Sequence, residues 1–286
     1  MTDKAKVYLI EDSFFDIVYQ NKCIRVAKRH EIYAPGIIDN FDSYFAMVRP
    51  IEIDDILFVD YSTQRYHDVI GYDLYPIMFP ALAELSITDG CIQFANLKDG
   101  AVTLDLGAYS GLSSIQFDML ADGRVIAVEP DQITIKCALL NLKNYNRLTG
   151  RRIDLLKAAV WEKTGSCEFF SEGNMGASLF SGTNRSQIGS RVAAVTLSDM
   201  ARIYKLERVD FIKCDIEGAE LHIFKDKDFF KKFKPRILIE THEVNLDDVR
   251  TNTGEICRDI LKPYGYRFET LKEAGMQLSV VLCYPL

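Results

Sequence analysis

Acidic side chains and one histidine follow several short apolar runs in the sequence, where they could bind a ligand or transfer a proton. They are Asp105, Glu129, Asp215 with Glu217, and Glu240 with His242. Each stands at or just beyond the end of an expected strand, and ligands of an open α/β sheet bind at the carboxyl ends of its strands. A helix N-cap is the plain structural explanation for a single acid such as Asp215. Four acidic strand ends together instead predict a polar binding site along one edge of a sheet.

The segment 102–111, VTLDLGAYSG, is the stretch that most clearly predicts ligand binding. A short apolar run ends in Asp105, two glycines follow four residues apart, and the next apolar residues recur at helical spacing. We expect a strand, a glycine turn that brings backbone close to a ligand, and a helix whose free N–H groups suit a carboxylate or phosphate. Tyr109 occupies the position of the middle glycine in a dinucleotide fingerprint, so a pyrophosphate is not the first ligand to expect.

Glu129 ends the second expected strand, further along the chain from Asp105. A carboxylate there can accept a hydrogen bond from each hydroxyl of a vicinal diol, as in a ribose. This favours a cofactor that contains adenosine. The alternative is that Glu129 caps a helix or lies at the surface before Pro130.

The composition is that of an ordinary globular protein of 286 residues, with 48% hydrophobic and 26% charged residues. The 34 basic and 41 acidic residues give a net charge of −7, which argues against nucleic acid as the main partner. Seven scattered cysteines without a CxxC pair are typical of reduced thiols in the cytoplasm. No apolar run approaches the roughly 18 residues of a membrane span, so we expect a soluble, cytoplasmic protein that does not bind a membrane.

The distribution of charge predicts two parts with a boundary near residue 90. Residues 1–90 hold 8 basic and 15 acidic residues, which leaves 26 of each for the remainder of the chain. Short β-type runs and an amphipathic segment, 73–85, give the first part a small α+β character. We therefore expect an N-terminal accessory or substrate-binding module over 1–90 and a main domain over 91–286.

Strands and helices are expected to alternate from about residue 98 onward, with a hairpin at the end of the chain. This order predicts an α/β fold with a seven-stranded, mostly parallel sheet that contains one antiparallel strand. Further local expectations are irregular connections over 31–40, a short β-type run over 51–59, a charged connection over 225–234 and a helix over 248–261. Glu220 is expected to cap the helix after the fourth strand or to pair with Lys213.

Several short motifs follow one another across residues 98–243. They are DLGAYSG (105–111), VIAVEP (125–130), Leu140-Asn141 with Asn146, Ala158-Ala159-Val160, Ala177-Ser178-Leu179, VTLSDM (195–200), DFIKCDIEGAE (210–220) and IETH (239–242). On these motifs the chain resembles the FkbM family of S-adenosylmethionine-dependent methyltransferases, and the block KCDIEGAE (213–220) is the most specific of them. The resemblance does not extend to residues 1–90 or to the last 40 residues.

The resemblance implies a class I methyltransferase (Rossmann-like) fold over 91–286, with S-adenosylmethionine across the ends of the first two strands. Glu129 would hold the ribose, Ala159 would lie near the adenine, and Asp215 would border both the cofactor and the acceptor. The residues around the methionine part of the cofactor would be Asp105, Gly107, Ala108, Tyr109, Ser110 and Gly111. Tyr109 stands where the family often has Asn or His, so the polar contact of those side chains is not expected here.

The acceptor is expected where the fourth and fifth strands lie side by side, which brings Asp215, Glu217, Glu240 and His242 together. Methyl transfer to a hydroxyl needs a group that removes the hydroxyl proton. His242 is our candidate for that base, because an unperturbed imidazole titrates near pH ~6.5, with Asp215 or Glu240 to orient it. Two alternatives remain open: His242 only bonds the strand end, or the four residues bind a divalent cation that lowers the pKa of the acceptor. The cation is not favoured, so no residue is assigned to a metal.

The resemblance implies O-methylation of a small molecule or glycan hydroxyl. One alternative is an NAD-type Rossmann oxidoreductase, against which the missing middle glycine and the acidic end of the fourth strand argue. Another is a non-catalytic scaffold that binds S-adenosylmethionine, against which the polar cluster at the strand ends argues. The sequence is compatible with a homo-oligomer but does not determine the oligomeric state.

Overall fold

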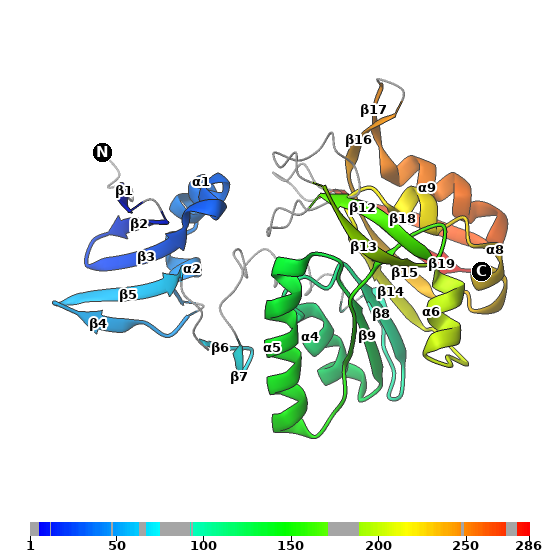
Figure 1. Cartoon of the computed structure of the whole chain (residues 1–286), viewed down its shortest axis with the longest axis horizontal. Helices are drawn as coiled ribbons and strands as arrows, with labels where there is room; N and C mark the ends of the chain where they lie inside the picture. The colour runs from blue at the N-terminus through cyan, green and yellow to red at the C-terminus, as the bar shows by residue number, and fades with distance from the viewer. Residues whose placement is uncertain are drawn as a thin grey trace.

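The computed structural model describes residues 6–11, 13–46, 48–62, 67–74, 92, 94–170, 189–246, 249–272 and 279–286. The chain forms a small N-terminal sheet and a larger C-terminal sheet flanked by helices (Figure 1). Among the described residues, no helix has the length and hydrophobicity that crossing a lipid bilayer requires.

The N-terminal sheet has the strand order β1-β2-β3-β5-β4. Its strands are β1 (Lys6–Glu11), β2 (Phe14–Tyr19), β3 (Lys22–Ala27), β4 (Ile51–Ile53) and β5 (Ile56–Tyr61). The 3-10 helix η1 (Lys28–Tyr33) and the helices α1 (Ala34–Asp39) and α2 (Phe41–Ala46) follow β3. Ile17, Ile24, Phe41 and Val59 lie in a core that the sheet and helices share. Among the described residues, the members of this core all come from the N-terminal part of the chain.

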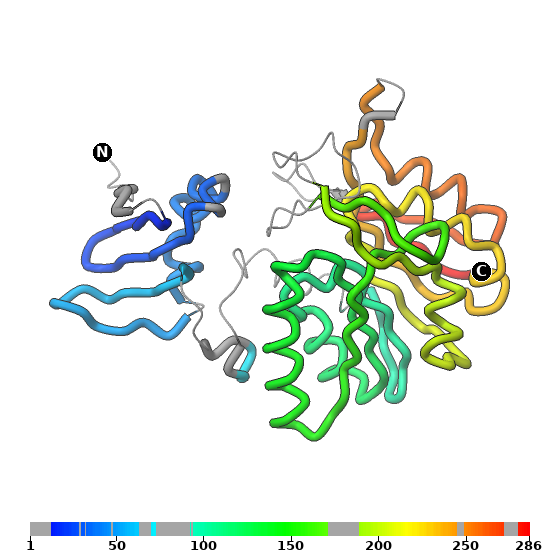
Figure 2. The backbone as a smooth tube through the Cα atoms, viewed as in Figure 1, coloured from blue at the N-terminus to red at the C-terminus, as the bar shows by residue number. Residues whose placement is uncertain are grey.

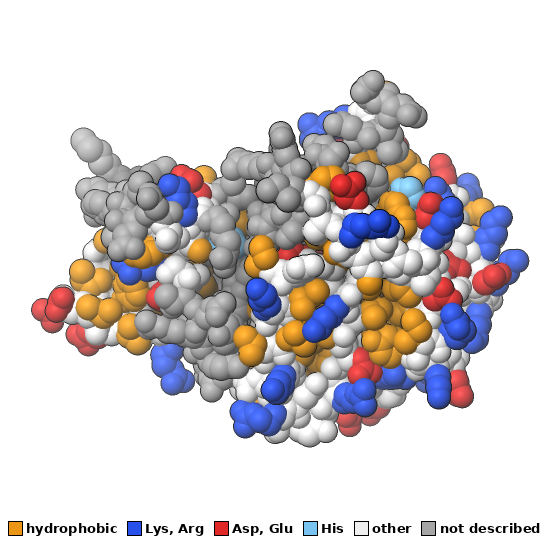
Figure 3. Space-filling view, in the orientation of Figure 1, with side chains coloured by type: hydrophobic (Ala, Val, Ile, Leu, Met, Phe, Trp, Pro, Cys, Tyr) orange, Lys and Arg blue, Asp and Glu red, His pale blue; other side chains and the backbone are white. Residues whose placement is uncertain are grey.

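One local expectation in this part of the chain is wrong. Residues 31–40 are largely helical, because a proline at the start of α1 suits the first turn of a helix. The β-type run expected over 51–59 is confirmed. Asp54 and Asp55 divide it into β4 and β5, because both adopt positive φ and form the turn of a hairpin. Figure 3 shows hydrophobic side chains on the surface of this sheet, and Ile51, Ile53 and Ile56 are exposed there.

A short hairpin connects the N-terminal sheet to the main domain along the chain. It consists of β6 (His67–Val69) and β7 (Tyr72–Leu74). The ring of Tyr72 packs edge-on against Tyr145 of the main domain, with 5.0 Å between ring centroids. The helix expected over 73–85 begins inside β7, and its remainder lies outside the described residues. The expected boundary near residue 90 also lies there and stays a prediction.

The main sheet has seven strands in the order β10-β9-β8-β14-β15-β19-β18, which confirms the class I methyltransferase fold. The strands are β8 (Val102–Leu106), β9 (Arg124–Val128), β10 (Asp154–Leu156), β14 (Phe211–Cys214), β15 (Arg236–Thr241), β18 (Tyr266–Lys272) and β19 (Ser279–Pro285). The first five in sheet order pair in parallel, and β19 is antiparallel to both of its neighbours. The strand order reverses between β8 and β14, which is where ligands bind in such sheets.

Helices cover both faces of the main sheet (Figure 1). They are α4 (Leu112–Ala121), α5 (Gln132–Thr149), α6 (Leu197–Ile203), α7 (Glu220–Ile223), α8 (Lys227–Lys232), α9 (Thr253–Leu261) and the 3-10 turn η2 (Lys262–Tyr264). Successive residues of a strand point to opposite faces, so Phe211 of β14 packs with residues of α4 and α5, whereas Ile212 packs with residues of α6 to α9. Both faces of the central strands are therefore buried.

Two further local expectations in the main domain are wrong. The segment 225–234 contains α8, because Asp226 caps the helix at the Phe229 N–H and two phenylalanines are buried on its inner side. The helix expected over 248–261 starts only at Thr253, after a hairpin of β16 (Glu243–Leu246) and β17 (Val249–Asn252). Figure 2 shows this hairpin rising beyond the end of α9.

A small third sheet lies beside the end of β10. It contains β11 (Ala159–Val160), β13 (Gly189–Val195) and β12 (Gly165–Phe170) in that order. The segment 171–188, which contains the motif Ala177-Ser178-Leu179, lies outside the described residues.

Candidate active site

The glycine turn after β8 is in contact with the end of β14. Gly107 adopts a φ of +77°, and a Cβ on it would lie 1.8 Å from the backbone oxygen of Asp215. No other residue fits there, because both the conformation and the space require the absence of a side chain. Gly111, with a φ of +82°, precedes the first turn of α4. The expected cofactor loop therefore contacts Asp215, which is the first residue of the expected acceptor side.

Asp105 is fully buried at the end of β8. Its carboxylate accepts hydrogen bonds from the hydroxyls of Ser113 (2.6 Å) and Ser114 (2.5 Å), and Lys213 Nζ lies 3.9 Å away. Burial raises the pKa of Asp105, and the Lys213 ammonium with the two hydroxyls offsets part of that effect. These hydrogen bonds connect the start of α4 to β8. Asp105 therefore stabilises the turn between the two elements from its buried side.

Asn141 of α5 holds the turn from the other side. Its Nδ2 donates a hydrogen bond of 2.9 Å to the backbone oxygen of Ser110, and the side chain is almost completely buried. Asn141 was not among the expected site residues. The Leu140-Asn141 motif was the feature of the sequence that could have identified Asn141 as a site residue. A buried polar residue on an amphipathic helix needs a specific partner.

Glu129 links the end of β9 to the same turn. One carboxylate oxygen accepts from the Tyr109 N–H at 2.9 Å, and the other accepts from the Asp131 N–H at 2.8 Å. Burial raises the pKa of Glu129 to about 7, although these two N–H donors counteract the shift. A carboxylate has about four acceptor positions, so each oxygen still has capacity for a hydroxyl donor. Tyr109 takes part through its backbone, with a φ of +50°, rather than through a side chain that resembles Asn or His.

Ala159 lies just after β10, the strand next to β9. It is buried in β11. The Glu129 N–H donates to the Leu156 carbonyl at 3.1 Å, which keeps the ends of β9 and β10 together. The glycine turn follows β8, Glu129 follows β9, and the segment before Ala159 follows β10. These three parts of the site therefore have the same order as the strands in the sheet.

Lys213 connects the turn to the acidic cluster beyond β14. Its Nζ donates to the Gly107 carbonyl at 3.0 Å and to Asp215 Oδ2 at 3.3 Å. The ammonium is largely buried and stands between Asp105 and Asp215. Lys213 thus fixes the distance between the glycine turn and Asp215.

His242 lies at the centre of the cluster formed by Asp215, Glu217, Glu220 and Glu240. Its Nδ1 is 2.8 Å from Glu220 Oε1, and its Nε2 is 3.6 Å from both Asp215 Oδ1 and Glu217 Oε1. The expected convergence of the fourth and fifth strands therefore occurs. The expectation for Glu220 is wrong in its partner, because this fully buried carboxylate of α7 bonds His242 instead of Lys213.

The cluster changes the proton affinity of its members. Burial alone would lower the pKa of His242, but the carboxylates of Glu217, Glu220 and Asp215 raise it well above its ordinary value of 6.5. Burial raises the pKa of Glu240 to about 8, Asp215 adds to the shift, and His242 and Lys213 oppose it. Several carboxylates thus compete for few positive charges in a largely buried cluster.

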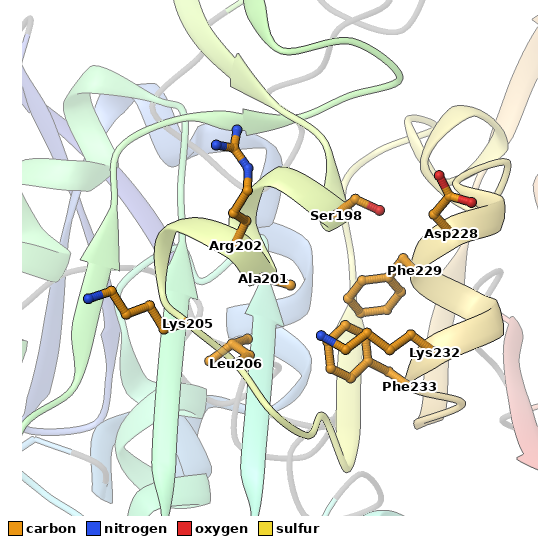
Figure 4. Close-up of a pocket in the computed structure, with 9 residues that line it drawn as sticks. All are labelled: Ser198, Ala201, Arg202, Lys205, Leu206, Asp228, Phe229, Lys232 and Phe233. Carbon is orange, nitrogen blue, oxygen red and sulfur yellow. The ribbon is translucent and has the colours of Figure 1, made fainter.

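One surface groove lies away from this cluster, between α6 and α8 (Figure 4). It measures about 450 Å³, and residues such as Ala201, Lys205, Phe229 and Lys232 line it. None of the residues that the sequence assigned to a site lines this groove. The candidate site is therefore the strand-end cluster and the glycine turn next to it.

The family model described as a methyltransferase FkbM domain matches residues 105–268, from the glycine turn to β18. No curated protein matches this sequence.

Many solved structures resemble the chain at low identity. A precorrin-6y C5,15-methyltransferase from Geobacter metallireducens has 16% identity and a TM-score of 0.42, covering 70% of this chain and 87% of its own. An S-adenosylmethionine-dependent methyltransferase from Aquifex aeolicus has 15% identity and a TM-score of 0.41, covering 71% and 92%. An rRNA methylase from Streptococcus thermophilus has 10% identity and a TM-score of 0.40, covering 73% and 99%.

The matched segment contains the glycine turn, Glu129, Lys213 and the whole cluster around His242. It also covers more than half of the chain. The protein belongs to the FkbM family of S-adenosylmethionine-dependent methyltransferases.

Proposed function

We propose that the protein transfers a methyl group from S-adenosylmethionine to a hydroxyl oxygen of a small molecule or glycan. The observation that carries this proposal is the contact between the glycine turn and the polar cluster, since Gly107 and Asp215 touch through their backbones. A methyl donor in the turn would thus stand next to groups that can hold an acceptor and take its proton. Methyl transfer is an in-line displacement, so this proximity is the main catalytic requirement.

The cofactor would lie across the ends of β8, β9 and β10. Its methionine part would occupy the turn at 107–111, its ribose hydroxyls would donate to Glu129, and its adenine would lie near Ala159. Two observations support this placement. Gly107 closely approaches the backbone oxygen of Asp215, and the Glu129 carboxylate can accept further hydrogen bonds.

The acceptor would lie against Asp215, Glu217, Glu240 and His242. A hydroxyl loses its proton as the carbon–oxygen bond forms, and this cluster supplies the proton-accepting groups. His242 can take that proton only while its ring is neutral, yet the surrounding carboxylates raise its pKa well above 6.5. The base role expected for His242 therefore depends on a further positive charge in the cluster.

The remaining parts of the proposal concern location and partners. The six described cysteines are free thiols, five of them buried, which supports a cytoplasmic protein with a reduced interior. We propose that residues 1–90 form an accessory or substrate-binding module, supported by the separate core of the N-terminal sheet. Acceptors other than nucleic acids are favoured by the net charge of −7.

The proposal is tested by incubating the protein with S-adenosylmethionine that carries a deuterated methyl group and with fractions of a cell extract. Mass spectrometry of metabolites, glycans and RNA then locates the label. Label in a metabolite or glycan supports the proposal, and label confined to RNA contradicts the substrate class. Binding of S-adenosylhomocysteine without any transfer would identify a scaffold, and binding of NADH alone would identify an oxidoreductase.

A further inference from the structure

We propose that Asp215, Glu240 and His242 bind a divalent cation at the acceptor side of the site. The binding of the cation is argued from the geometry of these residues alone. The catalytic role of the cation rests on the proposed function, since the bound cation would make the acceptor hydroxyl reactive.

The three side chains hold potential ligand atoms close to one another. One atom from each residue can be chosen so that all lie within 4.8 Å of one another. Two donors that each stand about 2.1 Å from one cation are at most about 4.2 Å apart, so a small closure completes the set. The separation of His242 Nε2 and Asp215 Oδ1, 3.6 Å, already meets this limit.

Glu220 prepares His242 for this role. Its Oε1 lies 2.8 Å from Nδ1, and when the ring is neutral with its hydrogen on Nδ1, Nε2, which is 3.6 Å from Asp215 Oδ1, carries the lone pair. A histidine that binds a metal almost always donates its other ring N–H to a carboxylate or carbonyl in this way. The placement of Glu220 is therefore what a cation site needs behind its imidazole ligand.

Glu240 supplies an independent observation. The residue is only 3% exposed, and its Oε2 has no hydrogen-bond partner among the described residues. A buried carboxylate oxygen without a partner costs free energy, because it has lost its water without replacement. A cation bound by the cluster gives this oxygen a partner that the described part of the chain does not provide.

The charge of the cluster favours the same conclusion. Asp215, Glu217, Glu220 and Glu240 surround the single imidazole, and Lys213 adds one ammonium beside Asp215. Four carboxylates against one lysine leave an excess of negative charge in a largely buried volume. A divalent cation reduces this excess and lets the carboxylates remain ionised.

The donor set indicates the kind of cation. Two carboxylates suit Mg²⁺ and Mn²⁺, and one imidazole shifts the preference toward Mn²⁺ or a later first-row metal. Three protein ligands leave coordination positions for water and for the acceptor hydroxyl. Binding there lowers the pKa of the hydroxyl, which is the same effect by which metals activate water.

The transfer step then balances as follows. The acceptor O–H bond breaks and its proton passes to the carboxylate of Glu217, while an oxygen lone pair forms the bond to the methyl carbon. The electrons of the carbon–sulfur bond return to sulfur, so S-adenosylhomocysteine leaves as a neutral thioether. His242 then serves as a ligand, and Glu217, which is 24% exposed at the edge of the cluster, serves as the base.

The test titrates the full-length protein with Mn²⁺ alone and follows the electron paramagnetic resonance signal of free Mn²⁺. We expect one bound Mn²⁺ per chain, at least tenfold weaker binding in Asp215→Asn and Glu240→Gln, and weaker binding in Glu220→Gln. Glu162→Gln is the matched control, since Glu162 also contacts a histidine, His222, at 3.2 Å outside the cluster. Binding of S-adenosylhomocysteine verifies that Glu240→Gln and Glu220→Gln are folded.

The outcomes separate the cation from the proposed function. No Mn²⁺ binding, or binding that the cluster variants leave unchanged, overturns the cation site. Methyl transfer that survives exhaustive chelation overturns its catalytic part while the proposed function stands. Mn²⁺ binding that depends on the cluster, in a protein that transfers no methyl group, leaves the site intact and removes the proposed function.

Discussion

Glu220 Oε1 lies 2.8 Å from His242 Nδ1, so the first turn of α7 fixes the orientation of a side chain at the end of β15. Glu220 is completely buried, and His242 is nearly so. The pair directs the second ring nitrogen toward Asp215 and Glu217. The chemistry that we propose for the acceptor depends on this orientation, whether the nitrogen receives a proton or a cation.

Replacement of Glu220 by Gln tests the importance of that orientation. We expect turnover to fall by about 10- to 100-fold, because a partner of this kind sets the tautomer and direction of the ring. The KM for S-adenosylmethionine should remain unchanged, since Glu220 does not touch the glycine turn. Steady-state kinetics measure both. A parallel loss in Glu162→Gln, at the partly exposed pair with His222, would show that the effect is not specific to the cluster.

Replacement of Gly107 by Ala should abolish cofactor binding. The new Cβ would meet the Asp215 carbonyl at 1.8 Å, so β14 and the turn would have to separate. Gly100→Ala is the control, because Gly100 has a similar φ of +76° but nothing within 4 Å of the added carbon. Both variants incur about 1–2 kcal/mol of backbone strain. Calorimetric titration with S-adenosylhomocysteine should therefore detect binding only in Gly100→Ala, and equal binding by both would contradict the role of the contact.

Replacement of Asn141 by Ala should loosen the turn through the lost hydrogen bond to the Ser110 carbonyl. We expect a stability loss of about 1–3 kcal/mol together with weaker binding of S-adenosylhomocysteine. Asn146→Ala removes a comparable pair of bonds from α5 to Ile153, remote from the turn. Denaturant unfolding and calorimetry should show destabilisation in both variants but weakened binding in Asn141→Ala alone. Weakened binding in both would assign the effect to α5 as a whole.

Glu129 gives cofactor binding a dependence on pH. Its pKa of about 7 means that the carboxylate loses a proton between about pH 6 and 8, and the ionised form accepts more hydrogen bonds from a ribose. Affinity for S-adenosylhomocysteine should therefore rise through this range and level off above it. Calorimetry at several pH values checks this, with Glu129→Gln as the comparison. An equal rise in the variant would place the titrating group elsewhere.

Ionisation of Glu129 has the opposite effect on the stability of the unliganded protein, which falls as pH rises. The pKa of Glu129 is raised from 4.5 to about 7 on folding, so its contribution to stability is present below pH 4.5 and is lost as pH rises through 7. The loss amounts to roughly 3 kcal/mol between these limits. The free energy of unfolding of the unliganded wild type, relative to that of Glu129→Gln, should decrease across this window. A constant difference would contradict the raised pKa.

The sequence predicts the main sheet well because its strands are buried on both faces and each is followed by a clear turn. Val102–Leu106 and Phe211–Cys214 are apolar except for Thr103, Asp105 and Lys213, and the two charged residues have buried partners. The acids at the strand ends were predictable for the same reason, since parallel strands bring their carboxyl ends to one edge.

Side-chain partners were less predictable. Glu220 and Asn141 act from helices on different faces of the sheet, and their partners depend on how those helices pack rather than on spacing along the chain. A helix cap or a pairing with Lys213 was expected for Glu220, whereas the folded chain places it beside His242. The turn between β4 and β5 and the helix α8 were missed because a two-residue turn and a helix cap determine them.

The most direct test of the proposed function identifies the atom that receives the methyl group. The protein is incubated with S-adenosylmethionine carrying a ¹³C-labelled methyl group and with the extract fraction that accepts label, and NMR measures the ¹³C shift of the product methyl. We predict a methyl carbon bound to oxygen, formed by the wild type and by Glu162→Gln but not by Asp215→Asn. A methyl carbon bound to nitrogen or carbon, or a labelled product formed equally by Asp215→Asn, would contradict O-methylation at this cluster.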